Sequence, residues 1–305
     1  LLEPFTSPLY PRETVEEFFV RKFGREAYRS LLGPLYGGLY ASDPGRMPAR
    51  HALGRVLEEF GVGRSLLLTF LRRGRQARRA VPTVSFRGGM GALPRALARS
   101  LGERLRLGTP VRAVVPGPGG RLQVEASSED PVEARAVVLT CPAPAAAGIL
   151  RSVAGDAADR LETLTYNPLA VVHLRGAGCG LRGFGYQVAF GEELETRGVT
   201  WNASIFDRDE IYTAYLGGMK NPDLVKEEDD ALGRIAAAEF AEATGCRARP
   251  LEVSRTRVPA WDHTWNGLEG IALPERIHLC AAYTGRPGIP GRIVAAKSLA
   301  KRLRA

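Results

Sequence analysis

The chain has 305 residues, a formal net charge of +9 and a hydrophobic content of 45%. This length can bury a large core in one or two domains, and the composition is that of a globular protein. The positive charge comes almost wholly from arginine that is spread along the chain and not interleaved with aromatic side chains, so we expect no nucleic-acid partner. No apolar run reaches the roughly 18 residues of a transmembrane helix, and no signal peptide is evident. We expect a cytoplasmic protein and leave peripheral attachment to a membrane open.

The cysteines are few and widely separated. No C-x-x-C pair occurs, which argues against a structural zinc site and suits a reducing compartment. We therefore expect no metal and no disulfide framework. The four residues are Cys141, Cys179, Cys246 and Cys280.

The first part of the chain predicts helices. Thr14 to Glu17 has the pattern of a capping box, so a helix begins at Thr14 and ends at Gly24. A second helix is predicted from Arg25, and the glycine-rich segment 33–44 is expected to turn the chain. The residues expected in the core of the second helix are Leu31, Leu32 and Leu35.

The segment 64–79 joins a leucine-rich half to a cluster of five arginines. A basic helix with a compact apolar end can lie in a membrane interface. A solvated arginine face beside a leucine stripe that faces the core is the simpler interpretation. The sequence leaves both open.

The next stretch predicts a strand, a glycine turn, a helix and a second strand. Val84 and Phe86 alternate as in a strand, and the glycines of segment 88–91 turn the chain. Pro94 suits the first turn of a helix, and 110–115 reads as the second strand. This order is typical of a βαβ unit.

Further strands are predicted over 121–126, 132–140 and 169–174. The second of these leads into Cys141, which we interpret as a small buried residue and not as a nucleophile, because no base lies near it in sequence. His173 alternates with apolar neighbours and is interpreted as a hydrogen-bonded strand histidine.

Residues 178–183 spell G-x-G-x-x-G, the form of a dinucleotide-binding fingerprint. That motif requires a helix directly after it, so that a phosphate meets the helix N-terminus. The strand-like run 184–190 follows instead, and we reject the fingerprint.

The last third predicts strands over 199–206 and 213–218, an amphipathic helix over 223–244 and a buried strand over 277–283. Strands followed by one long helix favour a substrate domain built on a mixed sheet. A glycine loop then precedes a helix over 292–303. Such a loop offers backbone N–H groups and the positive end of the helix dipole to an anionic partner.

Several of these motifs, in this order, resemble the protoporphyrinogen oxidases of the flavin amine-oxidase-like superfamily. The resemblance covers nearly the whole chain. It rests on E-T-V-E-E-F at 13–18, G-G-M-x-x-L-P-x-A-L at 88–97, V-V-L-T-C-P at 137–142, G-F-G-x-Q-V at 183–188 and G-I-P at 288–290.

The resemblance implies an α/β (mixed α+β) fold: a partial FAD-binding Rossmann-like domain, a mixed-sheet substrate domain and a helical region. The implied divisions are 1–83 (helical), 84–150 (FAD domain), 151–254 (substrate domain) and 255–305 (return to the FAD domain). The implied cofactor-binding residues are Val111 at the adenine end, Pro142, Gly288, Ile289 and Pro290. The implied substrate-binding residues are Phe184, Gly185 and Gln187.

The resemblance further implies an FAD-dependent oxidase of haem biosynthesis, which converts protoporphyrinogen or coproporphyrinogen to the porphyrin. Oxygen or another acceptor would take the electrons. No residue stands out as a catalytic acid or base. The family's amino-terminal G-x-G-x-x-G unit is not found, so we expect a chain without that first segment. Gln187 replaces the usual leucine, which keeps an amine oxidase or a carotenoid-type desaturase open. A binding module or an inactive fragment is the third reading.

Overall fold

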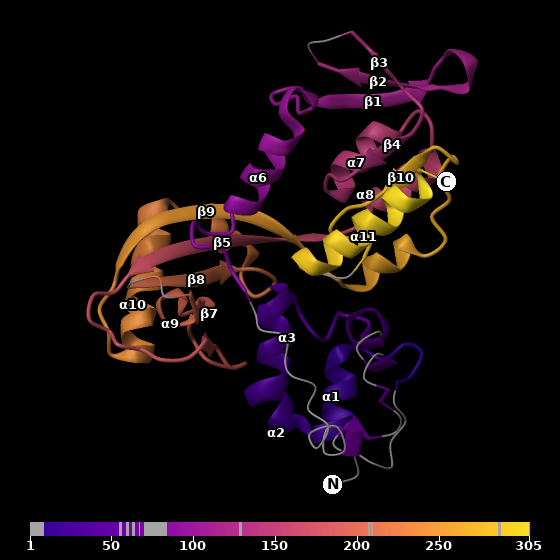
Figure 1. Cartoon of the computed structure of the whole chain (residues 1–305). Coiled ribbons are helices and arrows are strands. Elements are labelled where there is room, and N and C mark those ends of the chain that lie inside the picture. Colours follow the sequence, from indigo (N-terminus) through magenta and orange to yellow (C-terminus); the bar gives the residue numbers. More distant parts are fainter. Residues whose placement is uncertain are drawn as a thin grey trace. The chain divides into compact units, whose positions relative to one another are not determined.

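The computed structural model describes residues 9–54, 57–58, 61–62, 65–66, 68–69, 84–127, 130–206, 208, 210–285 and 288–304. The chain divides into two compact units, and each unit is built from two separate stretches of sequence (Figure 1). Unit 1 comprises Leu1–Pro82 and Thr165–His263, and unit 2 comprises Thr83–Leu164 and Thr264–Ala305. Both units combine helices with a sheet, as the α/β fold class predicts. The N-terminal helices belong to the same unit as the larger sheet.

Unit 1 begins with the helices α1 (Val15–Phe23), α2 (Arg25–Ala27) and α3 (Gly33–Tyr40). The predicted capping box is confirmed: Thr14 Oγ1 accepts from the Glu17 N–H at 3.2 Å, and the Glu17 carboxylate accepts from the Thr14 N–H at 2.9 Å. Gly24 ends α1 with φ of 88°, a conformation that favours glycine.

The prediction that 33–44 turns the chain is wrong for its first part. A π-helical turn, Tyr28–Leu32, leads directly into α3, which continues through the glycines. A Cβ on Gly33 would lie 2.6 Å from the Phe190 ring. Close packing against this face therefore overrides the low helix propensity of glycine.

The prediction for the core of the second helix is wrong for two of its three leucines. Leu31 is 65% exposed and Leu35 is 47% exposed, whereas Leu32 is half-buried. The face of the helix that packs inward is the one with the small residues.

Five strands form the sheet of unit 1 in the order β6-β7-β8-β5-β9, and every pair is antiparallel. The prediction of a mixed sheet is therefore wrong for this unit. The crossover through helix α10 (Asp229–Thr244) joins β8 to β9, but β5 lies between these two strands and runs opposite to both. The strands are β5 (Tyr166–Arg175), β6 (Gly185–Gln187), β7 (Thr196–Thr200), β8 (Ile211–Gly217) and β9 (Arg249–Pro259).

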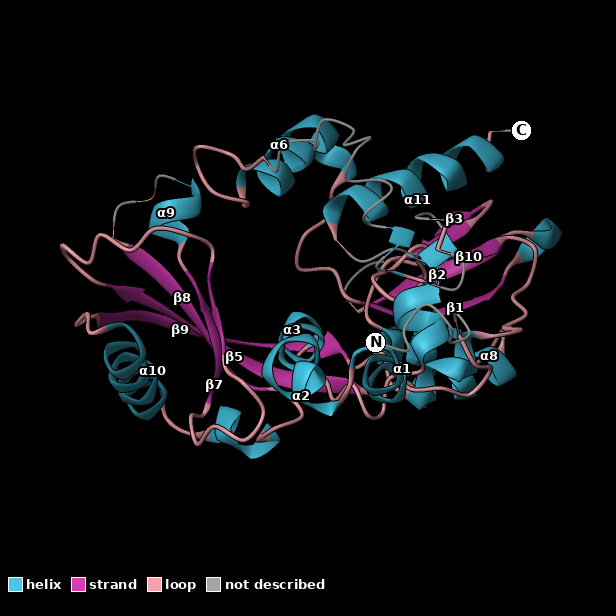
Figure 2. Cartoon of the chain, turned by 90° about the horizontal axis from the view of Figure 1, so that it is seen from below, coloured by secondary structure: helices cyan, strands magenta, loops and turns pink. Residues whose placement is uncertain are grey.

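Helix α10 covers one face of this sheet (Figure 2). Leu232, Ala236 and Phe240 are fully buried there, and the Phe240 ring lies 4.8 Å from that of Tyr212 on β8. The helix begins at Asp229, later than predicted, because residues 222–226 form a 3-10 turn. The predicted strand 199–206 ends at Thr200 and is followed by the short helix α9 (Asn202–Phe206).

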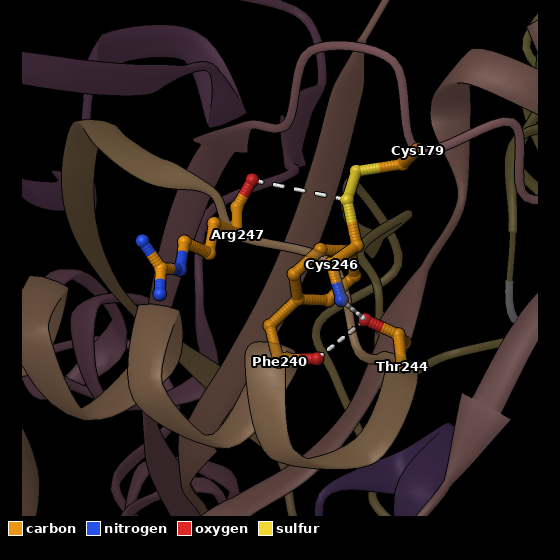
Figure 3. The surroundings of a disulfide bond; sticks show 5 residues. All are labelled: Cys179, Phe240, Thr244, Cys246 and Arg247. Carbon is orange, nitrogen blue, oxygen red and sulfur yellow. Dashed lines mark hydrogen bonds between the residues drawn. A yellow bond between two sulfur atoms is a disulfide. The ribbon is translucent and has the colours of Figure 1, made fainter.

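A disulfide bond joins Cys179, in the loop after β5, to Cys246, just after α10 (Figure 3). The Cα atoms are 5.6 Å apart. The Cys246 N–H donates to Thr244 Oγ1 at 3.2 Å, and that hydroxyl donates to the Phe240 carbonyl at 2.6 Å. The expectation of four reduced cysteines is therefore wrong for this pair. Their 67-residue separation left no sequence signal. Cys141 and Cys280 are free.

Unit 2 contains two small sheets. The antiparallel one has the strands β1 (Val111–Pro116), β2 (Leu122–Ala126) and β3 (Val132–Ala134). The parallel one pairs β4 (Val137–Leu139) with β10 (Ile277–Leu279). The helices are α6 (Ala92–Leu101), α7 (Ala143–Leu150), α8 (Gly155–Glu162) and α11 (Ile289–Arg302).

The predicted βαβ unit is wrong. Residues 84–86 form no strand in the described part of the chain, and β1 pairs antiparallel with β2. Val84 is 79% exposed, so this segment has no buried face that strand pairing would protect. The parallel pair of unit 2 is instead β4 with β10, which join distant parts of the sequence.

None of the helices in the described ranges is long and apolar enough to cross a membrane. Of the segment 64–79, the structure describes only Ser65, Leu66, Leu68 and Thr69. The predicted basic helix therefore lies outside the described residues.

Candidate functional site

The parallel strands β4 and β10 end side by side, and a helix follows each of them. Leu139 pairs with Leu279, and the Cys280 N–H donates to the Leu139 carbonyl at 2.9 Å. Helix α7 then begins after Pro142 and helix α11 after Gly288, and these two residues are the N-caps. Helix N-termini beyond the carboxyl ends of parallel strands are the usual place for a dinucleotide or another anionic cofactor.

Gly288 has a backbone conformation that needs glycine. Its φ is 84° and its ψ is 165°, and among the described residues a Cβ built there would meet only Pro290 Cδ, at 3.9 Å. Ile289 and Pro290 form the first turn of α11, and Ile289 is 40% exposed. The N–H groups of a first helical turn lack intrahelical partners, so Ile289 and Gly291 present donors there, whereas Pro290 has no N–H.

Arg292 connects that first turn to the loop after β10. Its guanidinium donates to the carbonyls of Ala281 and, at 3.0 Å, Gly285. Burial lowers the pKa of Arg292, and the nearby Cys280 opposes the shift. The sequence marked Arg292 only as the start of a helix, so this positioning contact was missed.

These features fit a flavin. The open Gly288 backbone lets a flat ring approach closely, and the positive end of α11 suits its electron-rich edge. Of the predicted cofactor residues, the structure brings Pro142, Gly288, Ile289 and Pro290 to helix starts that follow the same parallel pair. Val111 begins β1 in the other sheet of unit 2 and is 39% exposed.

The predicted substrate residues lie in unit 1. Phe184 is 80% exposed and directly precedes β6, whose first and last residues are Gly185 and Gln187. A Cβ on Gly185 would lie 2.0 Å from the Val199 carbonyl oxygen, so only glycine fits there. The Gln187 side chain lies against Gly38 of α3, where a Cβ would meet its amide oxygen at 1.9 Å.

Gly185 belongs to a row of paired residues on the sheet face opposite α10. Gly185 pairs with Thr200, Thr200 with Thr213, and Thr213 with His173. Residues directly opposite one another share a face. This row is polar: His173 Nδ1 lies 3.1 Å from Thr213 Oγ1, which donates to Asn202 Oδ1 at 3.1 Å.

The prediction that His173 is a hydrogen-bonded strand histidine is confirmed. Its alternation with apolar neighbours was the signal for it. The polar row itself was missed, because it is assembled from three strands that are far apart in sequence. Cofactor candidates and substrate candidates thus occupy different units, and each set is defined within its own unit.

Comparisons with known proteins agree with this geometry. The profile of the family described as flavin containing amine oxidoreductase matches residues 3–295. A chloroplastic protoporphyrinogen oxidase of Nicotiana tabacum is 29% identical over 261 residues, which is 75% of this chain and 48% of that protein. Protoporphyrinogen oxidase 2 of Arabidopsis thaliana is 26% identical over 319 residues, 88% of this chain and 63% of that protein. The chain spans about half the length of several of these curated relatives.

Solved structures show the same fold. A crystal structure from Exiguobacterium sp. 255-15, provisionally named a protoporphyrinogen oxidase, aligns with a TM-score of 0.75 at 22% identity. The alignment covers 97% of this chain and 68% of that one. Cyclohexylamine oxidase from Brevibacterium oxydans IH-35A aligns with a TM-score of 0.66 at 13% identity, covering 99% and 71%.

Proposed function

The chain belongs to the flavin containing amine oxidoreductase family, and from that premise we propose that it oxidises a porphyrinogen to a porphyrin. FAD is the cofactor of this flavin-dependent oxidoreductase. Bound FAD would supply the hydride-accepting chemistry at a carbon of the substrate, and oxygen or another acceptor would take up the electrons. On this proposal the protein serves haem biosynthesis.

The observation that carries the cofactor half of the proposal is the pair of helix starts beyond β4 and β10. Pro142 and Gly288 would hold the flavin there, and Arg292 would keep the loop of α11 in place. The substrate half rests on plant relatives named protoporphyrinogen oxidase, which match three quarters or more of the chain. Phe184, Gly185 and Gln187 would contact the substrate, and Val111 the adenine end of FAD.

A second candidate function is amine oxidation. The polar row from Gly185 to His173 and the amide of Gln187 favour a substrate that accepts and donates hydrogen bonds. A porphyrinogen macrocycle would be expected to meet a more apolar surface. The two functions differ in the substrate surface of unit 1 and share the cofactor.

The test begins with purified protein and added FAD, because flavin absorbance that stays with the protein after gel filtration reports binding. The loaded protein is then given protoporphyrinogen, coproporphyrinogen, putrescine or cyclohexylamine. Porphyrin fluorescence that rises faster than with heat-denatured protein supports porphyrinogen oxidation. Peroxide formed with an amine alone supports the second candidate. Protein that takes up no FAD would contradict both.

Replacing Gln187 by leucine sharpens this choice. The change removes the amide from the proposed substrate surface, and circular dichroism checks that the fold persists, because the Gln187 side chain also packs against Gly38. We expect turnover of a porphyrinogen to be kept or raised. A fall in porphyrinogen turnover with unchanged FAD uptake would count against an apolar contact at this position.

A further inference from the structure

A cavity of about 440 Å³ lies wholly within unit 1, between the first helices and the loop that follows β6. Pockets that hold small molecules have volumes of roughly 300–1,000 Å³. Part of the wall is aromatic: the rings of Tyr28 and Phe190 are 5.8 Å apart and meet edge to face. The charged residues of the lining are Glu16, Arg25, Arg29, Asp43, Arg197 and Lys220.

Arg197, on β7, is the half-buried cation of this cavity. A Cβ on Gly37 would lie 3.3 Å from its Nη2 atom, so the guanidinium packs against α3. Its Nε atom is buried and has no hydrogen-bond partner among the described residues. Burial lowers the pKa of Arg197 and the charge of Asp43 opposes this, but an arginine remains protonated at neutral pH. A buried N–H group without an acceptor destabilises the folded protein, so a ligand that supplies an acceptor for this group would gain binding energy.

Among the described residues, neither carboxylate of the lining neutralises Arg197 through an ion pair. Asp43 Oδ1 accepts from the Gly45 N–H at 2.8 Å. Burial and the negative charges of Glu16 and Asp43 raise the pKa of the Tyr28 hydroxyl, which keeps it protonated beside these carboxylates. Within the described part of unit 1, no ion pair of 4.0 Å or less joins Arg197 to either carboxylate.

Lys220 supports the rim of the cavity. Its ammonium donates to the carbonyl of Glu192, at 3.2 Å, and to that of Leu194. The lysine thereby fixes the loop that carries Phe190. Arg25 and Arg29 are exposed and line the same cavity. Four cations therefore face two carboxylates, which leaves an excess of positive charge.

We propose that this cavity binds a small organic anion, whose carboxylate or phosphate group accepts hydrogen bonds from Arg197. Arg25 and Arg29 add attraction, and an apolar or aromatic body of the ligand packs against Tyr28 and Phe190. A guanidinium pairs with carboxylate and phosphate oxygens through two parallel N–H donors, which gives this site its selectivity for planar or tetrahedral oxyanions. The site requires no flavin, so its test is independent of the proposed function.

The test uses benzoate and phenyl phosphate as probes, titrated into the protein by calorimetry at constant ionic strength. Benzyl alcohol serves as the uncharged probe. We expect at least one anion to bind and benzyl alcohol to bind far more weakly. Comparing the two anions distinguishes carboxylate from phosphate as the preferred group.

Two arginine variants locate the site. Arg197→Gln should weaken binding of the anion by about tenfold or more, because a charge-assisted contact is lost. Arg182→Gln removes an exposed arginine of the same unit outside the cavity and should leave binding unchanged. Equal affinity in the wild type and Arg197→Gln would overturn the proposal, as would failure of both anions to bind at millimolar concentration.

A second variant covers the case in which Arg197→Gln does not fold, as circular dichroism would show. Arg29 is exposed, and its Nη2 atom lies near Gly191 at the cavity wall. Arg29→Gln should keep the fold and weaken the same anion by a few fold. Unchanged affinity in a folded Arg29→Gln protein would then overturn the proposal.

Discussion

At the scale of single residues, some residues that carry the family resemblance stabilise the fold. Glu13 and Arg21 form a two-pronged ion pair, with Nε to Oε1 at 2.6 Å and Nη2 to Oε2 at 2.7 Å. The Glu13 side chain is only 3% exposed, and the Arg21 guanidinium lies 4.2 Å from the centre of the Tyr10 ring. The motif residue Glu13 and its partner Arg21 therefore hold α1 in place, and no substrate is needed to explain them.

Gly288 gives the sharpest test of the cofactor site. Gly288→Ala places a Cβ at a φ of 84°, which costs about 1–3 kcal/mol of backbone strain and adds bulk beside the first turn of α11. We expect FAD affinity to fall by more than the loss of stability explains. The measurement is flavin absorbance per folded protein, together with urea unfolding.

Gly24→Ala is the matched control, because Gly24 has φ of 88° and ψ of 162° and nothing within 4 Å of its Cβ position. The backbone cost is the same, but Gly24 belongs to unit 1, whereas α11 belongs to unit 2. The control should lose similar stability and keep its flavin. Equal flavin loss in both variants would show that Gly288 serves the turn alone.

Pro142 and Gly288 were predicted as cofactor-binding residues because the motifs around them resemble those of the family. Arg197 could not be predicted in the same way. The surroundings of Arg197 include Gly37, in α3, and Asp43, just after α3. Folding brings these two residues close to Arg197 from a distant part of the sequence. Long-range contacts of this kind leave no mark on neighbouring residues.

At the scale of elements, the predictions held where the pattern is local and failed where packing decides. The capping box of α1 and the strand β5 follow from caps and alternation. The eleven-residue strand β9 was missed, because its residues are mostly exposed and show little apolar alternation. Helix α3 was mistaken for a turn, because its glycines are used for close contact and not for flexibility.

Two substitutions distinguish a glycine that close packing requires from a helical glycine that has no such role. Gly33→Ala adds a methyl group 2.6 Å from the Phe190 ring, and we expect a loss of about 1–3 kcal/mol in the free energy of unfolding. Gly148 lies inside α7, is exposed and has nothing within 4 Å of its Cβ position. Gly148→Ala should raise stability by about 0.5–1 kcal/mol through helix propensity. Urea unfolding measures both, and shifts of the same sign would contradict this account of α3.

The disulfide is the other element-scale feature open to test. It ties the loop after β5 to the end of α10, so reducing it should lower the free energy of unfolding by about 2–4 kcal/mol. Denaturation with and without dithiothreitol gives the difference. Cys246→Ser should abolish the effect of the reductant, whereas Cys141→Ser should retain it, since Cys141 is free. If dithiothreitol left the free energy of unfolding of the wild-type protein unchanged, the disulfide would not stabilise the fold.

At the scale of the whole molecule, the two units have separate cores. Each unit is built from two stretches that are distant in the sequence. Ile277 is 2% exposed on β10, and Leu216 is fully buried on β8. Ile277→Asp places a charge in the core of unit 2, and Leu216→Asp places one in the core of unit 1. Each change should lower the free energy of unfolding of its unit by about 3–5 kcal/mol.

Hydrogen exchange should show these losses separately. Ile277→Asp should expose the amides of β4 and α11 while β5 and β8 stay protected, and Leu216→Asp should do the reverse. Loss of protection along the entire chain in both variants would mean that the units unfold together.

The interleaved order of the units also governs how the protein forms during synthesis. Ser42 donates to the Ala260 carbonyl at 2.5 Å, and Asn167 Nδ2 donates to the Ala41 carbonyl at 2.9 Å, so the first helices are anchored by residues translated much later. Strand β4 likewise cannot form its parallel pair until β10 has been synthesised. While the ribosome makes the intervening residues, the segment that follows α3 emerges without these partners, and chaperones are expected to bind such incompletely folded chains. Slowed translation before residue 165 would lengthen that interval and favour aggregation over assembly.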